Sequence, residues 1–209
     1  MGLRERKKQQ TRELLAETAR RLFSERGFER VSVAEIARAA DVSEKTVFNY
    51  FPTKEDLVYW RLESFEEELL EAVRSRAAGE SVVEAFGRFE SRPRGMLVAE
   101  DEATRERLAG LTRMIAQSPA LLAREQQIFA GYTDSLAALI AVETESSAVE
   151  AWVAANALMG VHRALVAHTR EQIVAGVPGP RLAEEVREEA DRALARLSDG
   201  LGGYGVREP

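Results

Sequence analysis

The chain has 209 residues, of which 45% are hydrophobic and 31% charged, and its formal net charge is −6. This composition is typical of a soluble globular protein with a sizeable core and room for two domains. Cysteine is absent, which excludes disulfides and thiolate metal sites. The basic start lacks the apolar segment of a secretory signal, and the longest uncharged apolar run, residues 151–161, is far shorter than the ~20 residues that cross a bilayer. We therefore expect a cytoplasmic protein.

Positive charge is concentrated at the N-terminal end. Residues 1–54 contain 12 Lys and Arg against 8 Asp and Glu, whereas the remainder contains 17 against 27. All the lysines lie in this first segment, which suits a phosphate-facing part attached to an acidic body. Its first residues form a basic arm, which is expected either to follow a phosphate backbone or to fray in solvent. The arm consists of Arg4, Arg6, Lys7 and Lys8.

The first predicted helix covers residues 9–26. Its apolar stripe consists of Leu15, Ala19, Leu22 and Phe23. Gly27 ends the helix, and Phe28 has the position from which a side chain folds back onto Phe23 in a Schellman motif. This helix is expected to support the segment that follows it.

Residues 32–54, with the sequence SVAEIARAADVSEKTVFNYFPTK, predict two short helices joined by a turn. Ser32 and Glu35 have the spacing of a capping box, so the first of these helices starts after Ser32. Ser43 is the N-cap of the second helix. Val47 and Phe51 lie one turn apart on this helix, and both are expected to face inward.

The other faces of that second helix carry polar and aromatic side chains. They are Glu44, Lys45, Thr46, Phe48, Asn49 and Tyr50. A helix with these side chains can contact base edges through its N-terminal residues and phosphates through its flanking residues. The same periodicity also fits an ordinary helix pair with no DNA function, which is the alternative interpretation.

The stretch VSEKTVFNYFPTKEDL, with the helix before it, resembles the signature of the TetR (tetracycline-repressor) family of bacterial transcription regulators. Two positions depart from the family pattern. Asp41 stands where the family usually has the turn glycine, and aspartate tolerates the left-handed conformation better than most residues. Phe48 stands where a tyrosine is frequent, and it cannot donate a hydrogen bond to phosphate. It is expected to pack on a thymine methyl or on sugar instead.

The resemblance implies a DNA-binding domain over residues 1–53 and a helical effector-binding and dimerisation domain over residues 54–209. The predicted DNA contacts are Ser32, Glu44, Lys45, Thr46, Phe48, Asn49, Tyr50 and Lys54. Lys54, at a predicted helix N-terminus, and Tyr50 are the best candidates for backbone phosphates. Lys45 and Asn49 are the candidates for base edges.

The rest of the chain is predicted to be helical, which gives an all-α fold of about nine helices, three and then six. The six cover residues 53–78, a short segment opened by the Ser81–Glu84 capping box, and residues 102–117, 119–142, 147–176 and 181–197. We expect the helix over residues 53–78 to act as a rigid lever between the two domains. The last two helices are predicted to form a four-helix bundle with those of a second copy.

A small apolar or amphipathic effector is expected to bind among the helices of the body. The predicted ligand contacts are Phe89, Met114, Phe129, Tyr132, Trp152, Asn156 and His162, with Phe86 and Met159 as further candidates. Side chains of these kinds are more often plain core than pocket wall. Tyr132, Asn156 and His162 are the better candidates because a buried polar tip needs a partner.

No motif in the sequence points to an enzyme, a metal or a cofactor. His162 and His168 are six residues apart and fall on different faces of a helix. Phosphate-binding glycine loops, zinc-protease motifs and nucleophile elbows are absent from the sequence. The leading hypothesis is a homodimeric repressor that binds a palindromic operator and is released by an effector. A DNA-binding protein without an effector and a helical interaction module are the alternatives.

Overall fold

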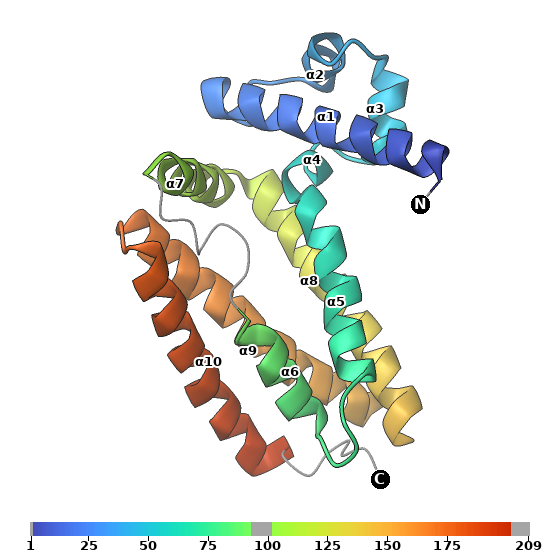
Figure 1. Ribbon diagram of the computed structural model, residues 1–209, viewed down its shortest axis with the longest axis vertical. Coiled ribbons are helices and arrows are strands. Elements are labelled where there is room, and N and C mark those ends of the chain that lie inside the picture. Colours follow the sequence, from blue (N-terminus) through green and yellow to red (C-terminus); the bar gives the residue numbers. More distant parts are fainter. Residues whose placement is uncertain (1, 93–101, 202–209) are drawn as a thin grey trace. The chain divides into compact units, whose positions relative to one another are not determined.

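The computed structural model describes residues 2–92 and 102–201, and these form an all-α protein, as predicted (Figure 1). Its α-helices are α1 (Leu3–Arg26), α2 (Val33–Ala39), α3 (Glu44–Tyr50), α4 (Asp56–Tyr59), α5 (Glu63–Arg74), α6 (Val82–Glu90), α7 (Glu102–Gln117), α8 (Pro119–Thr144), α9 (Ala148–Val174) and α10 (Gly179–Leu201). A 3₁₀ helix, η1 (Trp60–Leu62), separates α4 from α5. The predicted break over residues 92–95 lies mostly outside the described residues.

The chain divides into two compact units. Unit 1 consists of Met1–Glu63 together with Arg113–Glu125, and unit 2 consists of Ser64–Thr112 together with Gln126–Pro209. Unit 1 therefore includes more of the chain than the predicted segment 1–53, because it takes in the end of α7 and the first two turns of α8. The functional division between residues 1–53 and 54–209 remains a prediction.

In unit 1, helix α1 packs against α2 and α4. Its stripe is buried, with Leu15 and Ala19 fully enclosed and Phe23 2% exposed. Gly27 has φ +83° and donates its N–H to the Phe23 carbonyl, and the Phe28 ring lies 5.0 Å from the Phe23 ring between centroids. The helix starts earlier than residue 9, because the basic arm forms its first turns.

The predicted single helix over residues 53–78 is wrong, and this accounts for the additional helix in the described chain. The sequence of the region contains neither glycine nor proline, so no local breaker explains the interruption. Instead, Leu57 and Tyr59 are buried, and the Tyr59 hydroxyl donates to the Leu121 carbonyl at 3.0 Å. Tertiary packing of this kind overrides helix propensity.

Helix α5 also ends before the predicted residue 78. Directly after it, Arg76 turns inward and is only 2% exposed. Its guanidinium donates to the Val73 carbonyl at 2.8 Å and forms an ion pair with Glu143 of α8. A buried guanidinium requires such partners, so this contact holds the end of α5 against α8 within unit 2.

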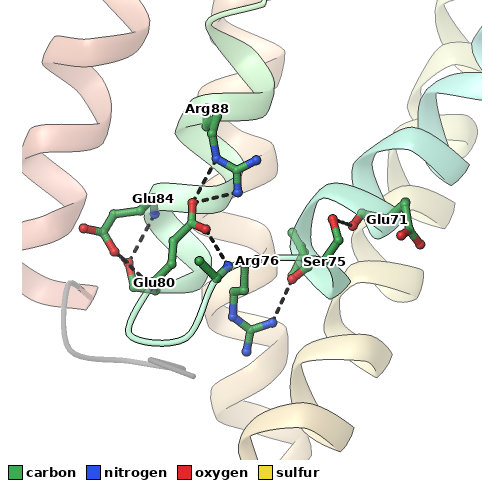
Figure 2. A network of polar contacts seen from close by, with 9 residues as sticks. Glu71, Ser75, Arg76, Glu80, Glu84 and Arg88 are labelled. Atoms are coloured by element: carbon green, nitrogen blue, oxygen red, sulfur yellow. Dashed lines mark hydrogen bonds and ion pairs between the residues drawn. The ribbon is translucent and has the colours of Figure 1, made fainter. Parts of the chain in front are cut away.

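The connection between α5 and α6 is organised around a second charged residue, Glu80 (Figure 2). One oxygen accepts the Ala77 backbone N–H at 2.9 Å, and the other accepts two guanidinium N–H groups of Arg88 at 2.7 and 3.0 Å. Burial opposes ionisation, but these hydrogen bonds prevail and the pKa of Glu80 is lowered. The loop is thereby tied to α6, which starts with the predicted Ser81–Glu84 capping box.

Helices α6, α9 and α10 pack against one another in unit 2 and lie side by side in Figure 1. Phe86 and Phe89 of α6 are 0% and 1% exposed, and Met159 of α9 is fully enclosed. Gly87 permits close approach of α10, since a Cβ atom there would lie 3.0 Å from Cδ1 of Leu194.

Candidate nucleic-acid interface

Helix α2 begins with the capping box that the sequence predicts. The Ser32 hydroxyl accepts the Glu35 N–H at 3.3 Å, and the Glu35 carboxylate accepts the Ser32 N–H at 2.9 Å. The carboxylate also pairs with Arg26 of α1 at 2.7 Å. The Ser32 backbone N–H, then Arg26 and the Ser32 hydroxyl, lower the pKa of Glu35 to about 2. The start of α2 is thus fixed both to its own cap and to α1.

The turn between α2 and α3 is a Schellman motif with aspartate in the position that favours glycine. Asp41 has φ +54°, which confirms the left-handed conformation expected for it. Its N–H donates to the Arg38 carbonyl at 3.3 Å, and the Val42 N–H donates to the Ala37 carbonyl at 2.9 Å. The turn therefore keeps its geometry without a glycine.

Helix α3 directs its polar residues outward. The Ser43 hydroxyl caps it by accepting the Thr46 N–H at 3.1 Å, and the Ser43 and Thr46 hydroxyls are 2.8 Å apart. Val47 and Phe51 are 1% and 0% exposed and hold the helix against unit 1. Four of the predicted contacts on this helix are exposed: Glu44, Lys45, Phe48 and Asn49. Tyr50 and Thr46 are half-buried.

Lys54 has a structural role that the sequence did not suggest. Its ammonium donates to the Phe28 carbonyl at 2.8 Å and to the Val31 carbonyl at 3.0 Å, and it lies 4.0 Å from the centroid of the Phe28 ring. An ammonium has three donors, so two of them serve the link between α1 and α2. The residue joins that link to the segment after α3, which makes it a positioning residue for the two short helices.

Polar contacts attach the α7–α8 segment of unit 1 to the rest of that unit. Asp56 accepts the hydroxyl of Thr53 at 2.8 Å and the Nε–H of Arg124 at 2.8 Å. The Ser118 hydroxyl donates to Glu29 at 2.6 Å. Sequence reasoning did not predict the contacts with residues 118–124, because their partners lie more than sixty positions away.

In unit 2 the structure brings together four of the predicted ligand contacts. They are Phe89, Phe129, Tyr132 and His162. The aromatic cluster that they form is centred on Phe65, which the sequence reasoning missed. The Phe65 ring lies 4.6 Å from the His162 ring, 5.3 Å from Tyr132 and 5.2 Å from Phe89.

A second missed residue, Glu90, gives the aromatic cluster a buried polar pair. Nδ1 of His162 lies 3.2 Å from a carboxylate oxygen of Glu90, and the two side chains are 10% and 7% exposed. Phe65 and Glu90 have no distinctive sequence signal. Each is placed by the packing of helices distant in sequence.

The remaining predicted ligand contacts lie elsewhere. Met114 belongs to unit 1 and is half-buried. Trp152 is 51% exposed, and the Asn156 amide donates to the Trp152 carbonyl of its own helix at 3.0 Å. Phe86 and Met159 are fully enclosed core residues.

Two features of the described residues bear on other functions. Within residues 2–92 and 102–201, no cluster of three or more His, Cys, Asp or Glu side chains could hold a metal ion. None of the helices in that same part of the chain combines the length and the apolar character needed to cross a membrane.

Comparison with known sequences gives a consistent result. Residues 15–59 match the model of a family described as bacterial regulatory proteins, tetR family. The HTH-type transcriptional regulator TcmR of Streptomyces glaucescens is 33% identical over 128 residues, 58% of this chain and 55% of that protein. The HTH-type transcriptional regulator LuxR of Vibrio harveyi is 57% identical over 44 residues, 21% of this chain and 22% of that protein. The matched regions thus span about half of TcmR and a fifth of LuxR.

Comparison with solved structures extends the likeness of fold over most of the chain. Salmonella enterica GusR has a TM-score of 0.50 at 21% identity and covers 92% of this chain and 95% of its own. FadR from Bacillus subtilis, solved in complex with stearoyl-CoA, has a TM-score of 0.50 at 20% identity, with 85% and 96% coverage. At these identities the comparison shows a shared fold.

Proposed function

We propose, from the premise that this chain belongs to the tetR family of bacterial regulatory proteins, that it represses transcription as a homodimer bound to a palindromic operator and released by a small molecule. The observation that carries the proposal is the match over residues 15–59, within which α3 presents Lys45 and Asn49 to solvent. A seven-residue helix, capped and buried on its inner side, is suited to entering the major groove.

The side chains of α3 divide into two kinds of contact. Lys45 and Asn49 are proposed to reach base edges, and Tyr50 and Thr46 to approach the sugar-phosphate backbone. Ser32, at the exposed start of α2, offers a further backbone contact, and Glu44 can accept from a cytosine amino group. Lys54 has one ammonium donor beyond its two carbonyl partners, so its phosphate contact is secondary to its positioning role.

The exposed face of α9 supports dimerisation. Val149, Trp152 and Val153 are 73%, 51% and 53% exposed, which is an unusual concentration of apolar surface at one end of a helix. Helix α10, also predicted to lie in the dimer bundle, is different, because Leu182 and Ala190 are buried within the chain's own unit 2. We therefore place the main contact of the twofold axis on α9. Sedimentation should give about 46 kDa, twice 23.2 kDa, and a monomer at micromolar concentration would contradict this proposal.

An apolar or amphipathic effector is proposed to enter the aromatic cluster and to loosen the hold on DNA. With the 53–78 lever interrupted at η1, α8 is the better transmitter, because this unbroken helix carries Arg124, paired with Asp56 in unit 1, and Tyr132 in unit 2. Coupling of this kind typically amounts to about 1–3 kcal/mol and is reciprocal. Operator DNA should then weaken effector binding by the same factor.

The proposal is tested first on DNA. In vitro selection followed by footprinting should yield a palindromic site with half-sites about 34–36 Å apart. Lys45→Ala and Asn49→Ala should change both affinity and base preference, whereas Tyr50→Phe should weaken binding to all DNA sequences alike. With roughly six phosphates neutralised per dimer, log affinity should fall against log salt with a slope near −5. If neither variant at positions 45 and 49 changes affinity or preference, α3 is not the reading helix.

The effector is tested separately. A ligand found by thermal shift should be titrated calorimetrically into free and operator-bound protein. Weaker binding to the complex supports induction. Equal affinities would leave a DNA-binding regulator that this ligand does not control.

A further inference from the structure

Helix α3 presents one large apolar side chain to solvent. Phe48 is 47% exposed, although Val47 beside it is 1% exposed and Phe51 is fully enclosed. Single exposed apolar residues are common on protein surfaces, so exposure alone decides nothing. The neighbours of Phe48 on the helix are what give it meaning.

Phe48 shares the outer face of α3 with the two proposed base readers. At about 100° per residue, Lys45, Phe48 and Asn49 fall within an arc of about 100°. All three are exposed, whereas Tyr50 is half-buried on a different face. The phenyl ring is therefore placed among the residues directed at base edges.

The chemistry of a phenyl ring limits what it can recognise in the major groove. It has no hydrogen-bond donor or acceptor, so it cannot distinguish bases through their polar edges. The apolar group that the major groove offers is the C5-methyl of thymine. We infer that Phe48 reads a thymine methyl and that each half-site carries a thymine opposite it. This inference rests on the proposed function, because it requires α3 to enter the major groove.

Methyl removal tests the inference on the unmodified protein. Once selection has given a site, each thymine is replaced in turn by deoxyuridine, which pairs identically but lacks the methyl group. Replacement of one thymine should weaken binding about three- to fivefold, as expected for the loss of one buried methyl contact, and replacement in both half-sites about tenfold or more. If every deoxyuridine site binds like the parent, Phe48 contacts sugar and the inference is wrong. If no sequence is selected at all, the proposed function fails with it.

Variants assign the effect to the ring. Phe48→Ala should bind thymine and deoxyuridine sites equally, and Phe48→Leu should retain part of the difference. The control is Leu122→Ala, which removes an apolar side chain of similar exposure, 40%, on α8 and should keep the full difference. Persistence of the difference in Phe48→Ala would overturn the inference. If Phe48→Ala binds too weakly to measure, Phe48→Leu and the wild-type comparison of thymine with deoxyuridine sites still test the inference.

Discussion

Different kinds of contact stabilise the interior of each of the two units. In unit 1, segments distant in sequence meet through charged or polar side chains that bind backbone or each other, as Lys54 does with two carbonyls and Asp56 does with Arg124. In unit 2, rings and apolar helix faces around Phe65 and Phe86 supply the core, and the buried pair of His162 with Glu90 lies within it. Unit 1 should therefore be sensitive to loss of one polar group, and unit 2 to loss of volume. Trp60 lies in unit 1 and Trp152 in unit 2, so fluorescence of single-tryptophan variants can follow each unit.

The largest effect is expected in unit 2 from Phe86→Ala. This side chain is fully enclosed, and its removal leaves a cavity as well as losing burial, so the free energy of unfolding should fall by about 3–5 kcal/mol. Urea unfolding followed through Trp152, in a Trp60→Phe background, measures it. Val174→Ala, at a residue 51% exposed, should change stability by less than about 0.5 kcal/mol. Comparable losses in both variants would show that α6 is not the core helix.

The next effect is expected in unit 1 from Lys54→Met. The substitution keeps the aliphatic stem but leaves two carbonyls without their donor, at a cost of about 1.5–3 kcal/mol. Unfolding of unit 1 followed through Trp60, with Trp152→Phe, should report it. Lys45→Met is the control, because that lysine is exposed and should affect DNA affinity without affecting stability. If Lys54 only bound phosphate, Lys54→Met would lower DNA affinity and leave stability unchanged.

A smaller effect is expected from the ion pair between α4 and α8. The Arg124 side chain is 33% exposed and that of Asp56 11%, so solvent screens the pair and the coupling should be about 0.5–1 kcal/mol. A double-mutant cycle of Arg124→Gln and Asp56→Asn measures this coupling. Asp56→Asn should cost more than Arg124→Gln, because Asp56 also accepts the hydroxyl of Thr53. Additive losses would mean that residues 113–125 are attached to unit 1 by other contacts.

The smallest effect is a pH dependence at the start of α2. The pKa of Glu35 is about 2 in the folded chain and near its ordinary value of 4.5 when unfolded. The stabilisation is therefore complete above about pH 4.5 and is lost as the pH falls from there towards 2. The stability difference between wild type and Glu35→Gln should shrink over that window. In an Arg26→Gln background the difference should depend less on pH, and an unchanged dependence would mean that Arg26 does not lower the pKa of this carboxyl.

The same contrast explains what the sequence could predict. The starts of α2, α3, α6 and α9 were predicted correctly because a serine caps each helix within three residues, as in the boxes of Ser81 with Glu84 and Ser147 with Glu150. The turn at Asp41 was also predictable, since the left-handed conformation is a local property. These features depend on neighbours along the chain.

Features that depend on distant segments were missed. The break at η1 has no glycine or proline to mark it, and the partners of Lys54 lie 23 and 26 residues away. The pair of Glu90 with His162 joins positions 72 apart. Four members of the aromatic cluster were predicted from polarity and size, but its central ring, Phe65, resembles any core phenylalanine in the sequence.

The two-part composition of unit 1 has a consequence for protein engineering. Its residues come from Met1–Glu63 and from Arg113–Glu125, so no single contiguous gene fragment encodes it apart from the body. A fragment that stops at residue 63 would lack the residues between 118 and 124 that contact Glu29, Tyr59 and Asp56. A chimeric regulator that joins Met1–Glu63 to the body of another regulator should therefore also carry residues 113–125. These residues would replace the corresponding helix junction of that other body.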